Sequence, residues 1–110
     1  IEKFSFSKNK IDLFNMSDAL NFKPDIVINC TSAGLNNQSL KLSEGIMTKN
    51  TYIYDLSYSP EDTPFLKLAK SRGIESYHDG IGMLINQAAL SFEIWTRQKP
   101  NSGINKDELL

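Results

Sequence analysis

Apolar residues along the chain gather in short runs that alternate with amphipathic stretches. Residues 25–30 (DIVINC) and 51–56 (TYIYDL) are nearly continuous apolar runs, rich in β-branched or aromatic residues, and both predict strands. A run without polar alternation is typical of a parallel strand covered on both faces, which we expect for 25–30. Residues 74–77 (IESY) predict a last short strand.

Two helices are predicted between and after these strands. Pro64 suits the first turn of a helix that runs to about Arg72, with Thr63 as N-cap and Gly73 at the C-cap. A longer helix is expected from about 80 to 98. Because strands alternate with helices, the sequence predicts an α/β fold: a partial doubly wound, Rossmann-like parallel sheet with a long C-terminal helix.

The pattern is weaker at the two ends of the chain. Residues 11–14 (IDLF) could form a short strand, and Ser17 could cap a short helix over 17–22. Residues 99–110 read as a polar C-terminal tail. Since the chain opens on Ile1 rather than on Met, we interpret it as a fragment or a processed chain.

Composition narrows the class of protein. The chain has 110 residues, 40% of them hydrophobic and 23% charged, with a formal net charge of −1, which indicates one ordinary globular domain. Lys and Arg are scattered, so a nucleic-acid partner is not expected, and no apolar run is long enough to predict a membrane span. The single cysteine, Cys30, follows a predicted buried strand and should serve packing; it excludes an internal disulfide and suits the cytoplasm.

The long helix contains one polar residue in an unexpected place. At about 100° per residue, Asn86 and Glu93 share a polar stripe, whereas Gln87 lies on the face of Met83. A buried amide without partners costs about 1–3 kcal/mol. Gln87 is therefore expected to bond either a group of its own protein or a ligand.

Candidate ligand-binding groups follow the predicted strands. In open α/β sheets ligands bind beyond the carboxyl ends of strands, where residues 31–34 and 57–60 place hydroxyls and exposed backbone, although ordinary turns explain them equally well. The chain has no G-x-G-x-x-G motif. Gly80 and Gly82 have only its first spacing, and a helix start that needs close backbone approach is the better explanation.

Other reactive residue types give weaker signals. His78 is the only histidine and is expected in a surface loop, so no metal site is predicted. Asp55 ends a predicted strand, where we expect a structural role such as capping a loop or orienting a neighbour.

Three segments, in order, resemble the C-terminal half of shikimate dehydrogenases. They are 29–35 (NCTSAGL), 54–73 (YDLSYSPEDTPFLKLAKSRG) and 79–95 (DGIGMLINQAALSFEIW). The family pattern is Asn-x-Thr-x-x-Gly, then Asp-x-x-Tyr-x-Pro with Thr-Pro-Phe-Leu, then Asp-Gly-x-Gly-Met-Leu-x-x-Gln-Ala-Ala. The resemblance covers roughly 25–95.

The resemblance implies an enzyme that reduces 3-dehydroshikimate to shikimate with NADPH, in aromatic amino-acid biosynthesis. Tyr58 and Gln87 match residues that hold the shikimate hydroxyls, which would explain the unusual glutamine. Met83 would pack against the nicotinamide, and Leu56 and Gly80 would contact it largely through backbone. The residues that the resemblance assigns to the cofactor are Asn29, Thr31, Ser32, Gly34, Leu56, Gly80 and Met83.

The family's acid–base lysine and aspartate match nothing here. The resemblance implies that the N-terminal catalytic domain and the glycine-rich loop are absent, and that residues 1–98 are the C-terminal part of the NADP-binding domain. We therefore expect no catalytic residue in this chain and no activity from the chain alone. A half sheet would also leave an open edge, through which the chain could self-associate.

Three alternatives remain at this point. A quinate/shikimate dehydrogenase using NAD would share these motifs, because cofactor choice lies in the segment that is not present. A non-catalytic Rossmann-half binding module is a second alternative, which the presence of both Tyr58 and Gln87 disfavours. A purely structural domain with Gln87 bonded internally is the third.

Overall fold

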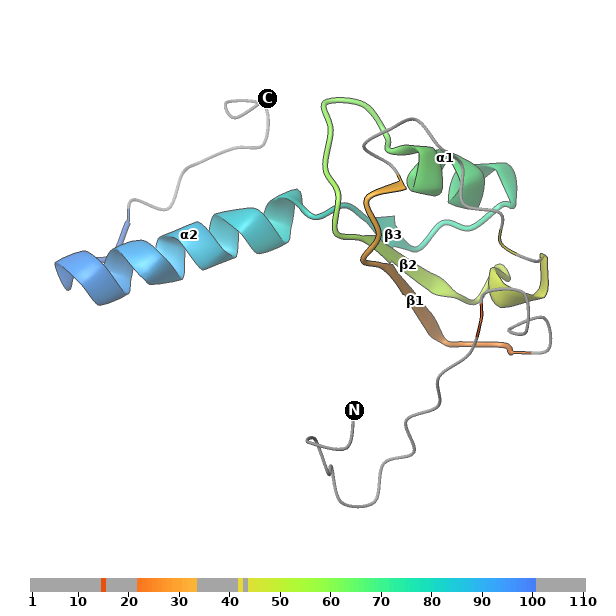
Figure 1. Ribbon diagram of the computed structural model, residues 1–110, viewed down its shortest axis with the longest axis horizontal. Coiled ribbons are helices and arrows are strands. Elements are labelled where there is room, and N and C mark those ends of the chain that lie inside the picture. Colours follow the sequence, from red (N-terminus) through yellow and green to blue (C-terminus); the bar gives the residue numbers. More distant parts are fainter. Residues whose placement is uncertain (1–14, 16–21, 34–41, 43, 101–110) are drawn as a thin grey trace, which may run out of the picture.

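The computed structural model describes residues 15, 22–33, 42 and 44–100, which form a small parallel sheet with helices (Figure 1). In chain order the elements are β1 (Ile26–Asn29), the 3-10 turn η3 (Glu44–Ile46), β2 (Tyr52–Asp55), α1 (Pro64–Ser71), β3 (Tyr77–His78) and α2 (Ile81–Thr96). The sheet order is β1-β2-β3, and both strand pairs are parallel. The predicted α/β class and parallel sheet are confirmed.

Helix α1 forms as its sequence predicts. The Thr63 hydroxyl accepts a hydrogen bond from the Leu66 N–H at 3.3 Å, and Pro64 occupies the first turn, where its missing N–H costs nothing. The helix ends at Ser71 with Arg72 as its C-cap, and Gly73 follows with φ +72°, a left-handed conformation that suits glycine.

The hydrophobic core lies between α1 and one face of the sheet. Ile53, at the centre of β2, is fully buried, and Ala69 of α1 is buried with it. The other members of this core cluster are Met47, Phe65, Leu66 and Ile74. These contacts fix α1 against the sheet, and they leave the carboxyl ends of the strands for the loops described below.

The opposite face of β1 is exposed. Ile26 and Ile28 are 59% and 55% exposed, and the strand register places them beside Tyr52 and Tyr54 of β2. The expectation that this strand is covered on both faces is therefore wrong for the described residues. An apolar run specifies a strand, but it does not supply the second layer that would cover it.

The last strand lies later in the chain than expected. It spans Tyr77–His78 rather than 74–77, because Ile74 turns into the core directly after α1. Pairing begins only at Ser76, whose carbonyl accepts the N–H of Ile53 at 2.9 Å. His78 is therefore in a strand and not in a loop, as had been expected, although its side chain is exposed.

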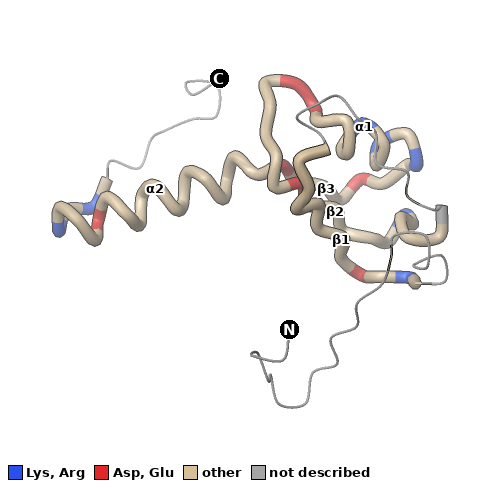
Figure 2. Tube along the Cα trace, viewed as in Figure 1, with Lys and Arg blue, Asp and Glu red and all other residues tan. Residues whose placement is uncertain are grey.

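Helix α2 extends away from the sheet, as Figure 1 shows. Its bounds agree with the predicted helix to within two residues, but Ile81 is its only buried residue, while Leu90 and Trp95 are 60% and 81% exposed. Glu93 is its only charged residue, so Figure 2 shows it almost uncharged. The apolar residues of α2 are therefore not part of the core described above, since no described segment packs along the length of the helix.

Some expectations fall outside the described residues. These are the short strand at 11–14, most of the helix at 17–22, Gly34, and most of the polar tail. Within the described ranges, no helix is both long and apolar enough to cross a membrane.

Candidate functional site

The carboxyl ends of β1 and β2 meet at one edge of the sheet. Asn29 ends β1, Asp55 ends β2, and the strand register pairs these two residues directly. Two loops leave from this point, 30–33 after β1 and 56–60 after β2, and α2 starts beside them at Gly80. This is the edge at which ligands bind in open α/β sheets.

Buried polar side chains connect the two strand ends. Asn29 is 4% exposed, and its Nδ2 donates to Oδ1 of the fully buried Asp55 at 3.0 Å. The same Oδ1 accepts the Ser57 N–H at 3.0 Å, and Oδ2 accepts the Thr63 hydroxyl at 2.5 Å. Asp55 thus orients its neighbours, as its position at the end of a strand predicts.

Asn29 also shapes the loop that follows β1. Its Oδ1 accepts both the N–H of Thr31 at 3.0 Å and the Thr31 hydroxyl at 2.7 Å. The N–H of Ala33 donates in turn to the Thr31 hydroxyl at 3.4 Å. Thr31 and Ser32 remain exposed at the surface of this loop.

The backbone of Gly80 lies against the loop after β2. Its N–H donates to the Ser57 carbonyl at 3.0 Å, and a Cβ at Gly80 would lie only 2.1 Å from the carbonyl oxygen of Leu56. The Leu56 N–H donates to the Asn29 carbonyl at 3.0 Å. The predicted close approach at this glycine is therefore confirmed, and hydrogen bonds or backbone contact connect Asn29, Leu56 and Gly80.

The remaining candidate residues lie farther out from this edge. Met83 is half-buried in the first turn of α2, Tyr58 is 44% exposed, and Gln87 is exposed in the second turn. Tyr58 and Gln87 make no side-chain hydrogen bond within the described residues. The premise that Gln87 is a buried amide is therefore wrong, since α2 has no neighbour on that face in the described structure.

Cys30 differs from its expected environment. Its side chain is exposed, because it is the first residue beyond β1 and points out of the loop rather than into the core. Packing is therefore not its role among the described residues. The described part of the chain also contains no cluster of side chains that could hold a metal ion.

A shallow hollow of about 410 Å³ lies near the start of α2. Within it the Tyr52 hydroxyl lies 2.8 Å from Nδ1 of His78, and the two rings stack with centroids 5.7 Å apart. Sequence analysis did not find this pair, because only strand pairing brings the two residues together. The lining residues are Tyr52, Tyr54, Asp62, Leu66, Tyr77, His78, Asp79, Ile81 and Gly82.

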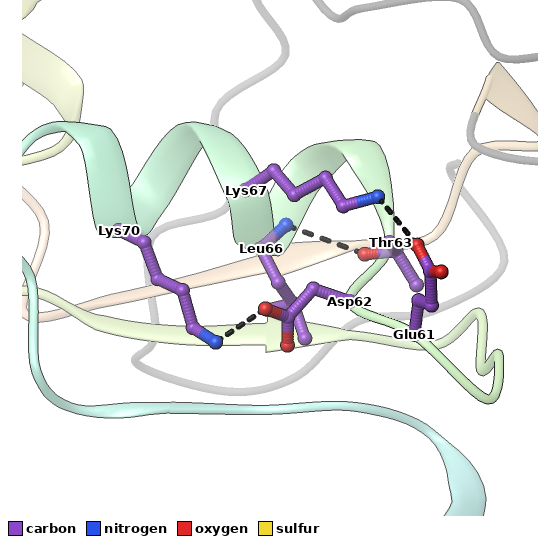
Figure 3. A network of polar contacts seen from close by, with 6 residues as sticks. All are labelled: Glu61, Asp62, Thr63, Leu66, Lys67 and Lys70. Atoms are coloured by element: carbon purple, nitrogen blue, oxygen red, sulfur yellow. Dashed lines mark hydrogen bonds and ion pairs between the residues drawn. The ribbon is translucent and has the colours of Figure 1, made fainter.

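Charged residues before α1 pair with lysines on its surface, as Figure 3 shows. Lys67 bonds Glu61 at 3.2 Å between Nζ and Oε2, and Lys70 pairs with Asp62. The hydrogen bond to Asp62, and secondarily that to Tyr77, raises the pKa of Lys70 above its ordinary value of 10.5. Because the side chains of these pairs are partly or largely exposed, the pairs contribute little to the stability of the fold.

Comparisons with known proteins relate the chain to one enzyme family. The family model for the shikimate 5'-dehydrogenase C-terminal domain matches residues 80–104. The shikimate dehydrogenase (NADP(+)) of Alcanivorax borkumensis is 42% identical over 79 residues, which are 72% of this chain and 28% of that protein.

Two solved structures share the fold. An Ael1 enzyme from Pseudomonas putida superposes with a TM-score of 0.68 at 32% identity, over 79% of this chain and 32% of that one. The 5-ketofructose reductase of a Gluconobacter strain gives a TM-score of 0.57 at 39% identity, over 74% of this chain and 31% of that one.

The chain spans less than a third of the length of these relatives. The shikimate dehydrogenase (NADP(+)) of Methylobacillus flagellatus is 44% identical over 79 residues, and that of Alteromonas mediterranea is 35% identical over 98 residues. The chain therefore belongs to the shikimate dehydrogenase family over the region that it shares with these proteins.

Proposed function

We propose that this chain is the cofactor-binding part of an NADP-dependent shikimate dehydrogenase that reduces 3-dehydroshikimate to shikimate. The observation that carries the proposal is the convergence of Asn29, Leu56 and Gly80 at the carboxyl edge of the sheet. Three separate segments meet there with almost no space between their backbones, which is the arrangement expected where a fold presents its backbone to a ligand.

The groups at this edge fit a nicotinamide ring with its carboxamide. Met83 is half-buried one turn beyond Gly80 and offers a polarizable apolar wall, while Thr31 and Ser32 are exposed beside the end of β1. When bound, NADPH supplies the hydride. In this proposal the chain holds and orients the ring, with backbone at Leu56 and Gly80 and with the side chain of Met83.

Tyr58 and Gln87 are proposed to bind the substrate. Both are exposed and lie beyond the edge formed by Leu56 and Gly80. A phenol and an amide offer donors and acceptors that match the hydroxyls of shikimate. An exposed amide keeps its hydrogen-bonding capacity for such a ligand, which supports this role even though Gln87 is not buried.

We further propose that the 110 residues alone do not catalyse the reaction. Orientation of bound reactants can contribute about 7–11 kcal/mol in ideal cases, but only when the acid–base groups are also present. None of the residues assigned to the site is an acid or base placed for proton transfer.

The test joins this chain to the upstream part of the Alcanivorax borkumensis enzyme, in place of its matching 79 residues. We expect shikimate-dependent reduction of NADP⁺, followed by NADPH absorbance, from the chimera and none from the 110-residue chain. Gln87→Ala should raise the KM for shikimate about tenfold or more. Asn86→Ala, on the adjacent exposed position of α2, should leave it unchanged.

Three results would each count against a part of the proposal. A folded chimera without activity would exclude the assigned function, and activity in the short chain would mean that catalytic residues lie within it. Equal KM values for the two α2 variants would remove Gln87 from the substrate site.

A second substrate class is favoured by one specific observation. An enzyme described as a 5-ketofructose reductase shares 39% identity over 74% of this chain. Related chains therefore occur in enzymes named for different substrates, and in this proposal the parts of those enzymes outside the shared region decide among the substrates. Assays of the natural full-length protein with quinate, 5-ketofructose and shikimate, each with NADP⁺ and NAD⁺, would separate these possibilities.

We also propose that the chain self-associates through β1. This strand lies at the edge of the described sheet, and Ile26 and Ile28 are more than half exposed. An open apolar edge is a template for pairing with another chain. Sedimentation velocity should show concentration-dependent dimers, and a strictly monomeric profile at high concentration would contradict this.

A further inference from the structure

We infer that Asn29, Asp55 and Thr63 form a buried clasp that holds the loops after β1 and β2 in one fixed arrangement. The clasp makes Asn29 a positioning residue rather than a contact of the cofactor. This inference deepens the proposed function and rests on it in one respect: these loops are the ones assigned to the cofactor.

Three of the four hydrogen-bonding positions of the Asn29 side chain have partners within the protein. Its Oδ1 accepts two hydrogen bonds from Thr31, and its Nδ2 donates to Asp55. A carbonyl oxygen has two lone pairs, so this acceptor has no further capacity. Because the residue is only 4% exposed, it shapes the loop from below and leaves Thr31 at the surface.

Asp55 joins this arrangement to two further segments. Its two oxygens accept from the β1 end at Asn29, from the backbone N–H of Ser57, and from the hydroxyl of Thr63. Among the described residues, no Lys or Arg forms an ion pair with this buried carboxylate, and its partners are the three hydrogen-bond donors. Hydrogen bonds to a charged acceptor are about twice as strong as neutral ones, so this carboxylate is a firm anchor.

Thr63 closes the clasp at the start of α1. Its hydroxyl donates to Asp55 and accepts from the N–H of Leu66, so both functions of the hydroxyl are engaged. The rotation of Asp55 is thereby fixed by a helix that packs on the core. The hydrogen bonds of the clasp thus lead from the loop after β1 to the start of α1 through the side chains of Asn29, Asp55 and Thr63.

Because the clasp joins the two loops through consecutive hydrogen bonds, it predicts that a change at one end affects the other end. Cutting the clasp at one end should loosen the loop at the other end, although the hydrogen bonds of that distant loop are untouched. A merely structural role for these residues would instead lower protection everywhere, or only next to the substitution.

The test is amide hydrogen exchange followed by NMR in the full 110-residue chain. In Thr63→Val the hydroxyl is lost, and we expect the N–H of Thr31 to exchange at least about tenfold faster. In Asn29→Ala we expect the same increase in exchange rate at the N–H of Ser57, although its acceptor, Asp55, is still present. The N–H of Ile53, in the centre of β2, reports global opening and is used to normalise each variant.

Two controls separate coupling from loss of stability. Thr51→Val removes another fully buried threonine hydroxyl, at the opposite end of β2, where it bonds Thr48 and the carbonyl of Pro24. It should leave normalised exchange at Thr31 unchanged. Thr63→Ser keeps the hydroxyl and should restore the exchange rates of the original chain.

The inference is overturned if Thr63→Val and Thr51→Val give the same normalised exchange at Thr31, or if Thr63→Ser fails to restore it. Should Thr63→Val not fold, Asn29→Ala decides from the other end: unchanged exchange at Ser57 would refute the clasp. No cofactor is needed for these measurements, so the two proposals can fail separately. An inactive chimera would refute the proposed function and leave the clasp standing. An active chimera, together with hydrogen exchange that shows no coupling between the two loops, would refute the clasp and leave the proposed function standing.

Discussion

Replacing Gly80 by alanine is the most direct perturbation of the site. The new Cβ would lie 2.1 Å from the carbonyl oxygen and 2.7 Å from the carbonyl carbon of Leu56, both of them backbone atoms. Since backbone cannot turn aside as a side chain can, α2 and the loop after β2 must separate by roughly 1 Å. That movement would also stretch the 3.0 Å bond between the Gly80 N–H and the Ser57 carbonyl.

The expected cost can be estimated from these contacts. Overpacking typically destabilises a fold by about 1–3 kcal/mol, and a backbone clash belongs at the upper end. Alanine can adopt the backbone conformation of Gly80, with φ −79° and ψ −4°. The substitution also lowers the entropy of the unfolded chain, which offsets about 0.4–1 kcal/mol of the destabilisation. We expect a net loss of roughly 2 kcal/mol in the free energy of unfolding.

Gly82 provides a matched control two residues away. A Cβ there would meet nothing within 4 Å, and the residue lies inside α2. Alanine should therefore stabilise the helix by up to about 1 kcal/mol. The same chemical change is thus expected to have opposite signs at two neighbouring glycines.

Urea unfolding followed by circular dichroism measures both variants. At about 4 °C per kcal/mol, thermal melts should show a fall of about 8 °C for Gly80→Ala and a rise of up to about 4 °C for Gly82→Ala. If Gly80→Ala were as stable as the original chain, the close approach to Leu56 would not exist as described. A destabilised Gly82→Ala would refute the account of α2 as exposed at that position.

Three further predictions concern other parts of the fold. Gly73→Ala should cost about 1 kcal/mol in urea unfolding, because φ +72° is unfavourable for alanine, and an unchanged midpoint would contradict this. Asp62→Asn should lower the pKa of Lys70 in an NMR titration, and an unchanged pKa would exclude the ion pair. In the original chain, the stabilisation that follows from the raised pKa of Lys70 is complete below pH 10.5 and is lost as the pH rises through the pKa of the folded state. Ile53→Ala should cost about 2–5 kcal/mol, whereas Ile28→Ala, at 55% exposure, should cost far less, and equal losses would mean that the exposed face is covered in solution.

Local sequence signals account for the elements that formed as expected. Thr63, Pro64 and Gly73 determine the bounds of α1, because cap bonds and the φ preferences of proline and glycine act within a few residues. The run at 51–56 likewise contains β2, since β-branched and aromatic residues favour the extended chain. Gly80 and Gly82 predicted the start of a helix with a close backbone approach, and the contact between Gly80 and the Leu56 carbonyl confirms it.

Sequence reasoning was wrong where burial depends on a partner layer. Gln87, Cys30 and Ile28 stand in apolar surroundings in the sequence, and each is exposed in the described structure. Helical and strand periodicity reports which residues share a face, but it does not report whether another segment covers that face. The same limit applies to α2, whose apolar residues are exposed because the helix extends away from the sheet (Figure 1).

The sequence by itself determined the parallel α/β plan, the caps of α1, the close approach at Gly80 and the family of the shared region. Only the tertiary structure decided which polar groups meet. Asn29 and Asp55 are 26 residues apart and Asp55 and Thr63 are eight apart, and no local pattern predicts their hydrogen bonds. Strand register creates the first contact and packing of α1 creates the second, because a buried carboxylate is stable only where several donors converge on it.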